Sequence, residues 1–152
     1  MSDLVGFATF MRFLAPPIPA PSTPASTRGS ALFTSIGCSL CHTPSMKTAT
    51  SSVAALSNQT VNLFSDLLLH HMGTGLTDNI TQGLAGPDQF RTAPLWGVGQ
   101  RLFFLHDGRT SDLMTAIQAH ASSGSEANAV IQNFNNLFID QQSDVISFLQ
   151  TL

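Results

Sequence analysis

The chain has 152 residues, of which 43% are hydrophobic, enough for one compact domain with a short attached segment. Six lysines and arginines stand against nine aspartates and glutamates, giving a net charge of -3, and the basic residues never cluster, which argues against nucleic-acid binding through a basic patch. No apolar run approaches the roughly 20 residues needed to span a bilayer, and residues 1–17 lack the features of a signal peptide.

Residues 2–14 predict an amphipathic helix, because their apolar side chains fall on one face at helical spacing. The members of this stripe are Leu4, Phe7, Ala8, Met11 and Leu14. Residues 15–27 hold five of the eight prolines and predict an extended, semi-rigid linker. The first helix is therefore expected to stand apart from the rest of the chain.

A second helix is expected after the linker, with Leu32, Phe33 and Ile36 on its buried side. It leads into the stretch "IGCSLCH", residues 36–42, which contains the only two cysteines, Cys38 and Cys41. Three kinds of site use this spacing. A redox disulfide needs a βαβ context that the sequence does not display, and a zinc site would need His70 and His71 to complete it.

The third kind of site is a covalently attached haem C, which accounts for all three fixed positions of the motif. The spacing lets Cys38 and Cys41 reach the two vinyl groups on one edge of a porphyrin. The imidazole of His42 then falls beneath the iron as its first axial ligand. The motif therefore predicts haem as the cofactor and an iron ligand at His42.

The remaining segments predict further helices joined by long loops, with no strongly indicated β-strand. Residues 43–62 form a Ser/Thr-rich loop with room for one short extended piece, residues 63–78 a short helix or turn, and residues 87–109 an irregular loop. Another helix is expected to begin with Ser111 as its N-cap and Asp112 in its first turn. Residues 140–152 form the terminal helix, with Val145, Phe148, Leu149 and Leu152 in one stripe.

Several of these segments, taken in order across nearly the whole chain, resemble the C-terminal haem domain of the bacterial di-haem cytochrome c peroxidase superfamily, in its thiol-oxidoreductase-like branch. The segments are "FMRFLAPP", "IGCSLCHTP", "LLLHHMG", "FRTAPLWGVG", "FLHDGRTSDLMTAIQAH" and "FLQTL". The resemblance implies a mostly α-helical, cytochrome c-like haem domain with covalent haem C and a periplasmic location. It also implies that an upstream haem domain meets the substrate while this domain supplies electrons.

Domain organisation follows from the linker and from the resemblance. Residues 1–14 are expected to be the end of a preceding domain, residues 15–27 a linker, and residues 28–152 the haem domain. The similarity between "SDLVGF" and "SDVISF", near the two ends of the chain, agrees with this reading. The expected partner is a second haem domain or redox protein, and a dimer through the N-terminal helix is the alternative.

His120 is the predicted ligand on the other face of the iron. In the family that the chain resembles, an iron ligand lies fourteen residues past the histidine of the "HDG" turn. In this chain the histidine of that turn is His106, so the corresponding position is His120. An imidazole on the apolar face of a helix is costly to bury unless a metal or a hydrogen bond satisfies it. A core histidine with an ordinary hydrogen bond is the structural alternative, and Met72 is the alternative ligand.

The other candidates for this position are weaker. Met114 lies beside Leu113 and is expected to fill the core, and Met46 follows His42 too closely to reach the opposite face. His106 is expected to be a buried, hydrogen-bonded structural residue. Arg91, Arg101 and Arg109 could pair with haem propionates, with simple surface solvation as the alternative.

Two functions follow from the sequence. The first is electron transfer, in which one covalent haem relays single electrons to or from a partner redox centre of a di-haem peroxidase-like oxidoreductase. The second is an enzyme with an open haem face that reduces peroxide itself, with His106 or His70 as acid-base group. The sequence leaves open whether the chain is itself an enzyme.

Overall fold

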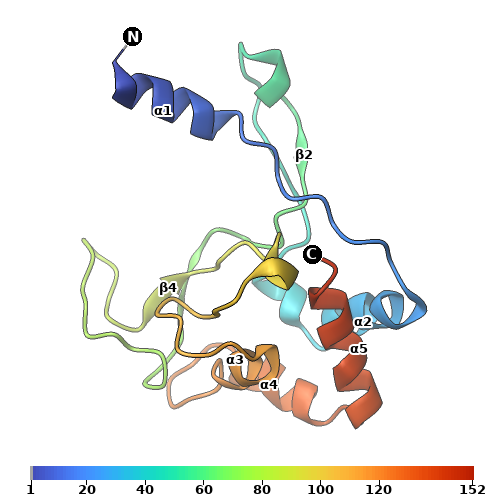
Figure 1. Cartoon of the computed structure of the whole chain (residues 1–152). Coiled ribbons are helices and arrows are strands. Elements are labelled where there is room, and N and C mark those ends of the chain that lie inside the picture. Colours follow the sequence, from blue (N-terminus) through green and yellow to red (C-terminus); the bar gives the residue numbers. More distant parts are fainter. Residues whose placement is uncertain (1) are drawn as a thin grey trace.

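The computed structural model describes residues 2–152 and contains five α-helices, three short 3-10 helices and four short strands within them. Figure 1 shows the helices α2 and α5 packed together, while α1 stands apart and the hairpin that contains β2 projects from the body. The expectation of a helix-rich fold with long loops is confirmed, and of the short strands only an extended piece in residues 43–62 was expected. Within these residues, no helix is both long enough and apolar enough to cross a membrane.

The core of the domain is the contact between α2 (Pro24–Ser35) and α5 (Ile139–Leu149). Most residues of their predicted stripes are buried in one cluster, which includes Phe33, Val145, Phe148 and Leu149, and the half-buried Leu32 packs against it. Gly29 allows the two backbones to approach closely, because a Cβ at this position would overlap the carbonyl group of Asp144. Arg28 donates two hydrogen bonds to the carboxylate of Asp144, at 2.7 and 2.8 Å, and ties the same two helices together.

Helix α2 begins earlier than the end of the predicted linker. Thr23 is its N-cap and accepts a hydrogen bond from the backbone N–H of Ser26, whose hydroxyl accepts one from the N–H of Thr23. Pro24 occupies the first helical position, where a backbone N–H would have no hydrogen-bond partner within the helix, so that its absence in proline loses no hydrogen bond. The last proline of the linker thus starts a helix instead of preventing one.

Helix α1 (Asp3–Arg12) forms as predicted, with Ser2 as its N-cap, and none of its residues is buried. The extended segment after it returns to the body of the domain. Ala20 donates a backbone hydrogen bond to Thr151 at 2.8 Å, and Pro17 lies against Gly97. The helix therefore exposes its apolar side chains while the following linker is held on the domain surface.

Two pairs of antiparallel strands form in the middle of the chain. Strand β1 (Met46–Lys47) pairs with β2 (Thr60–Val61), which is the short extended piece for which the Ser/Thr-rich loop had room. Strand β3 (Leu69–His71) pairs with β4 (Gln89–Arg91). The prediction of a helix or turn over residues 63–78 is therefore wrong where β3 runs, because pairing with a distant segment outweighs the local pattern.

Helices α3 (Leu113–Gln118) and α4 (Asn128–Asn135) lie before α5 in the chain. The N-cap of α3 is Asp112, whose carboxylate accepts a hydrogen bond from the backbone N–H of Thr115 at 2.7 Å, so the prediction of Ser111 as N-cap is wrong by one residue. Helix α4 was not predicted, although its Ile131 and Phe134 are buried. Met114 packs against the core cluster, as expected.

Candidate functional site

The two cysteines lie on a tight turn that directly follows α2. Gly37 has a left-handed backbone (φ 104°) that ends the helix, and a 3-10 helix from Cys38 to Leu40 begins immediately after it. Cys41 is the C-cap of this helix, and its backbone N–H donates a hydrogen bond to the carbonyl of Cys38, so the two cysteines close one turn of the chain. Both are free thiols. Burial raises the pKa of the Cys38 thiol to about 11, so it is protonated at neutral pH.

His42 is held in one orientation by the neighbouring segment of residues 64–66. Its ring Nδ1 lies 3.0 Å from the carbonyl oxygen of Phe64 and donates a hydrogen bond to it, which leaves Nε2 as the nitrogen with a free lone pair. Burial lowers the pKa of His42 to about 4, so the ring is neutral at pH 7. A neutral imidazole with a fixed tautomer and a free Nε2 is ready to bind a metal.

His120 lies just after the end of α3 and has the same type of support. Its Nδ1 donates a hydrogen bond to the carbonyl oxygen of Ala116 at 2.8 Å, and burial lowers its pKa. After burial, a smaller cause of the low pKa of His42 is the repulsion between its ring and that of His120 when both are protonated. Because this repulsion decreases with distance, the two imidazoles lie in the same region of the molecule. Both ligand assignments, His42 and His120, remain predictions.

The other predicted candidates lie in different surroundings. His106 is exposed and its ring stacks on Phe90, with centroids 4.2 Å apart, so the expectation that it is buried is wrong. The backbone of Met72 bridges to Ser125, and its side chain is half-buried, so its role as alternative ligand stays a prediction. Met46 is exposed in β1.

The three arginines differ in their partners. Arg101 donates to the carbonyl of Pro94, and Arg109 pairs with Asp107 and donates to the carbonyl of Gly75. Arg91 is exposed in β4, and no ion pair found in residues 2–152 involves it. Its predicted pairing with a haem propionate stays a prediction.

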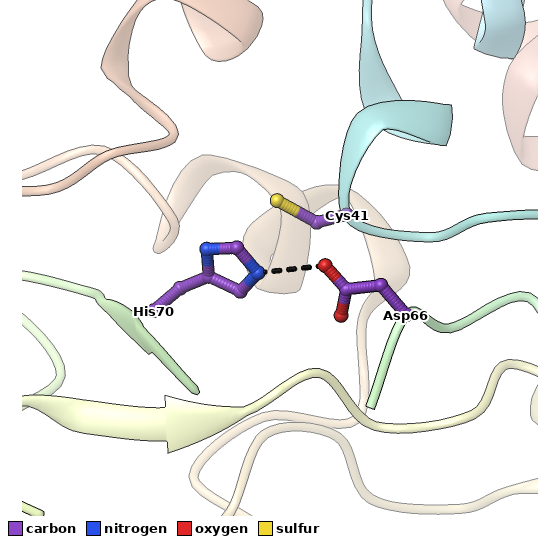
Figure 2. A group of neighbouring side chains, drawn as sticks. All are labelled: Cys41, Asp66 and His70. Carbon is purple, nitrogen blue, oxygen red and sulfur yellow. Dashed lines mark hydrogen bonds and ion pairs between the residues drawn. The ribbon is translucent and has the colours of Figure 1, made fainter. Parts of the chain in front are cut away.

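A cluster of charged side chains that the sequence did not reveal lies beside Cys41. His70 sits between two carboxylates, with Nε2 at 2.9 Å from Asp66 and Nδ1 at 2.8 Å from Glu126 (Figure 2 shows the pair with Asp66). Since a carboxylate only accepts hydrogen bonds, both ring nitrogens of His70 carry a proton when both contacts are made. The pKa of His70 is raised, and the hydrogen bond with Glu126 is the main cause. His71 faces a different pair of side chains, Asp88 and Gln89.

This cluster joins the two segments that carry the predicted iron ligands. The backbone N–H of Asp66 donates to the carbonyl of Cys41 at 2.8 Å, next to His42. Glu126 follows Ser125, whose hydroxyl donates to the carbonyl of His120 at 2.6 Å. His70 therefore links the neighbourhood of one candidate ligand to the neighbourhood of the other.

The residues present fit a covalently bound haem. Two free thiols lie three residues apart on one turn, and the next side chain is a neutral imidazole whose free nitrogen is Nε2. A second neutral imidazole, with its Nδ1 likewise bonded to a backbone carbonyl, lies in the same region. A thioredoxin-like disulfide is not supported, because the fold of residues 2–152 lacks a parallel βαβ unit.

Comparisons with known proteins agree with this reading. The sequence profile of the family described as "Di-haem oxidoreductase, putative peroxidase" matches residues 2–152. A similar solved structure, described as "Crystal structure of a MauG-like protein associated with microbial copper homeostasis", superposes with a TM-score of 0.54 at 22% identity, which shows a shared fold. The match covers 88% of this chain but only 48% of that chain. No curated protein sequence matches.

Proposed function

Because this chain belongs to the di-haem oxidoreductase family, we propose that it is an electron-transfer haem domain of such an oxidoreductase, with one covalent haem C. The observation that carries the proposal is the turn of Cys38, Cys41 and His42, with the ring of His42 fixed by the carbonyl of Phe64. A haem bound there supplies one-electron chemistry. The chain has one such motif, whereas the family is named for two haems.

Each residue of the site has a defined task in this proposal. Cys38 and Cys41 would hold the porphyrin through thioether bonds, and His42 and His120 would bind its iron through Nε2, the ring nitrogen that their Nδ1 hydrogen bonds leave free. The carbonyl groups of Phe64 and Ala116 fix both tautomers, as the outer partners of metal-bound histidines generally do. Two imidazoles favour a lower reduction potential than an imidazole and a thioether. This supports the transfer of electrons over the direct binding of peroxide.

The proposed partner is a second haem domain that contacts α1. Seven apolar side chains of α1 and of the two residues after it are about half exposed or more: Leu4, Val5, Phe7, Phe10, Met11, Phe13 and Leu14. Apolar surface of this extent, on a helix that buries nothing in its own domain, is typical of a contact surface. A second copy of the chain is the alternative partner. We further propose a periplasmic location, where c-type haem is attached.

The test is to produce the chain in a periplasm equipped for haem attachment. Mass spectrometry should find the added mass of one haem, which stays with the protein after denaturation. The oxidised protein should have the absorption spectrum of low-spin iron and should bind cyanide slowly. An unmodified mass would refute the haem assignment. High-spin iron that reacts quickly with peroxide would instead support the alternative function, a peroxide-reducing enzyme that uses His70 or His106.

A further inference from the structure

Cys41, Asp66 and His70 bring three potential metal ligands together, with Sγ, a carboxylate oxygen and a ring nitrogen all within 4.8 Å of one another (Figure 2). We propose that these three residues bind a divalent transition metal of the zinc and cobalt class in the chain before haem is attached. The site needs no haem and therefore does not rest on the proposed electron-transfer function.

The surroundings of His70 are those of a metal-binding histidine. Glu126 lies 2.8 Å from Nδ1, the nitrogen that does not face Asp66, and can hold the ring in place while Nε2 binds a metal. Metal-bound histidines almost always donate their second N–H to such a partner. The metal ion would replace the proton that now lies between Nε2 of His70 and Oδ2 of Asp66, which are 2.9 Å apart.

Asp66 is also held in position. Its Oδ1 accepts a hydrogen bond from the backbone N–H of Leu68 at 3.0 Å, which leaves Oδ2 directed at His70. The backbone N–H of Asp66 bonds to the carbonyl of Cys41 at 2.8 Å, so the two ligands are neighbours for reasons independent of their side chains. All three ligand residues are half-buried, which leaves access for an ion.

One sulfur, one nitrogen and one oxygen suit zinc or cobalt, with a water molecule as the fourth ligand. Metal–ligand bonds of about 2.0–2.3 Å place tetrahedral ligands about 3.5 Å apart. The three atoms lie within 4.8 Å in the metal-free chain, so they need to approach by about 1 Å.

This site differs from a zinc site made of both cysteines and both adjacent histidines. The side chain of His71 bonds to Asp88 at 2.9 Å and to Gln89 at 3.0 Å instead. Cys38 is not part of the cluster of ligand atoms. Cys38 and His71 therefore serve as matched controls, because Cys38 lies three residues before Cys41 and His71 directly follows His70, while neither side chain belongs to the site.

Haem attachment and metal binding would compete for the same sulfur. In attachment, the S–H group of Cys41 adds across a vinyl double bond, the sulfur–carbon bond forms and the hydrogen goes to the neighbouring carbon, without net oxidation. The resulting thioether no longer provides a thiolate. A metal held by Cys41 is thus expected to delay attachment, and attachment is expected to remove the metal site.

The test uses cobalt(II) with the full-length, reduced, haem-free chain. A sulfur-to-cobalt charge-transfer absorption should appear, and Cys41→Ser should abolish it while Cys38→Ser keeps it. His70→Ala should weaken binding at least tenfold, whereas His71→Ala should leave it unchanged. Glu126→Gln should weaken it by about 10–100-fold, the usual effect of removing an outer partner. Circular dichroism checks the folding of each variant, and the two histidine variants decide the question if Cys41→Ser fails to fold.

Three outcomes would overturn the proposal. Equal loss in both cysteine variants would assign the ion to the two thiols alone. Equal effects of His70→Ala and His71→Ala would identify unspecific binding by histidines. Cys41 and His70 are 29 residues apart, so only the folded chain brings them together. Cobalt binding that persists in urea would therefore show that the ion does not bind at this site. Equal rates of haem attachment with and without zinc would refute the claim that haem and metal compete for the sulfur of Cys41. A chain that never attaches haem but binds cobalt would refute only the proposed electron-transfer function.

Discussion

Gly29 in α2 lies directly against the backbone carbonyl group of Asp144 in α5, and no side chain fits between them. Alanine at position 29 would place a Cβ that overlaps this carbonyl and lies 2.9 Å from Cβ of Phe148. Since the α2–α5 contact forms the core, Gly29→Ala should lower the free energy of unfolding by about 1–3 kcal/mol, measured by urea unfolding.

Gly6 in α1 provides the control, because a Cβ at this position meets nothing within 4 Å. Gly6→Ala should leave the unfolding of the domain unchanged and favour the helical form of α1 by about 1 kcal/mol. Equal destabilisation by the two substitutions would contradict the assignment of the core to α2 and α5.

Replacement of His120 should change the haem spectrum. The Nδ1 of His120 is bonded to the carbonyl of Ala116, so only Nε2 is available to the iron. His120→Ala should therefore convert the oxidised protein to the high-spin form, whereas His120→Met should keep it low-spin and raise the potential. Met72→Ala and His106→Ala should do neither. Loss of the low-spin spectrum in Met72→Ala alone would identify Met72 as the ligand.

Removal of residues 1–14 should leave the haem domain intact. No residue of α1 is buried, while the contacts of Pro17 and Ala20 with the domain lie beyond the deletion. The melting temperature and the haem spectrum should therefore stay the same, and binding of a partner domain, measured by calorimetry, should be lost. A large fall in melting temperature would mean that α1 contributes to the fold of this domain.

Cys38 should react slowly with iodoacetamide in the haem-free chain. Burial raises the pKa of its thiol from 9.0 to about 11, and the thiolate is the reactive form. At pH 8 the Cys41→Ser variant should react about 100-fold more slowly than the same variant in urea, and the rate should rise about tenfold per pH unit. Mass spectrometry of timed samples measures the rate. Equal rates with and without urea would show that Cys38 is exposed.

His70 should stabilise the haem-free chain mainly in acid. Its pKa is raised by the hydrogen bond with Glu126 and, against the effect of burial, by Asp66. This contribution to stability is therefore complete below the unfolded value of about 6.5 and disappears as the pH rises through the higher folded pKa. Urea unfolding should find His70→Gln less stable than the natural chain by about 1 kcal/mol at pH 5.5 and by less at pH 8.5. A difference that grows with pH would contradict this assignment.

Helical stripes were the most predictable part of the fold. The 3.6-residue repeat identified α1, α2 and α5, because each helix carries its apolar side chains on one face at fixed spacing. That face is buried in α2 and α5, where it includes Phe33, Val145 and Phe148, and exposed in α1. Helix α4 was missed since its N-cap, Ala127, has no side chain that accepts a capping hydrogen bond. Strand β3 was missed because "LHH" has no alternating pattern of its own and depends on β4.

The candidate site was predictable only where its residues are close in sequence. Cys38, Cys41 and His42 form one local motif whose spacing specifies its chemistry. Asp66, His70 and Glu126 meet across 60 residues, and nothing in the local sequence around Glu126 indicates a partner at His70. Such a cluster follows from the tertiary fold, in which the β3 segment and the loop after α3 lie side by side.

The attachment of the linker limits how far a partner can move. Helix α1 ends at Arg12, and the chain first touches the domain again at Pro17. The four residues between them span at most about 14 Å when fully extended. A domain docked on α1 would therefore remain tethered within a short radius of the loop at Gly97, whatever its orientation. The proposed electron transfer to a partner docked on α1 would then take place at a high effective concentration for as long as the partner stays docked.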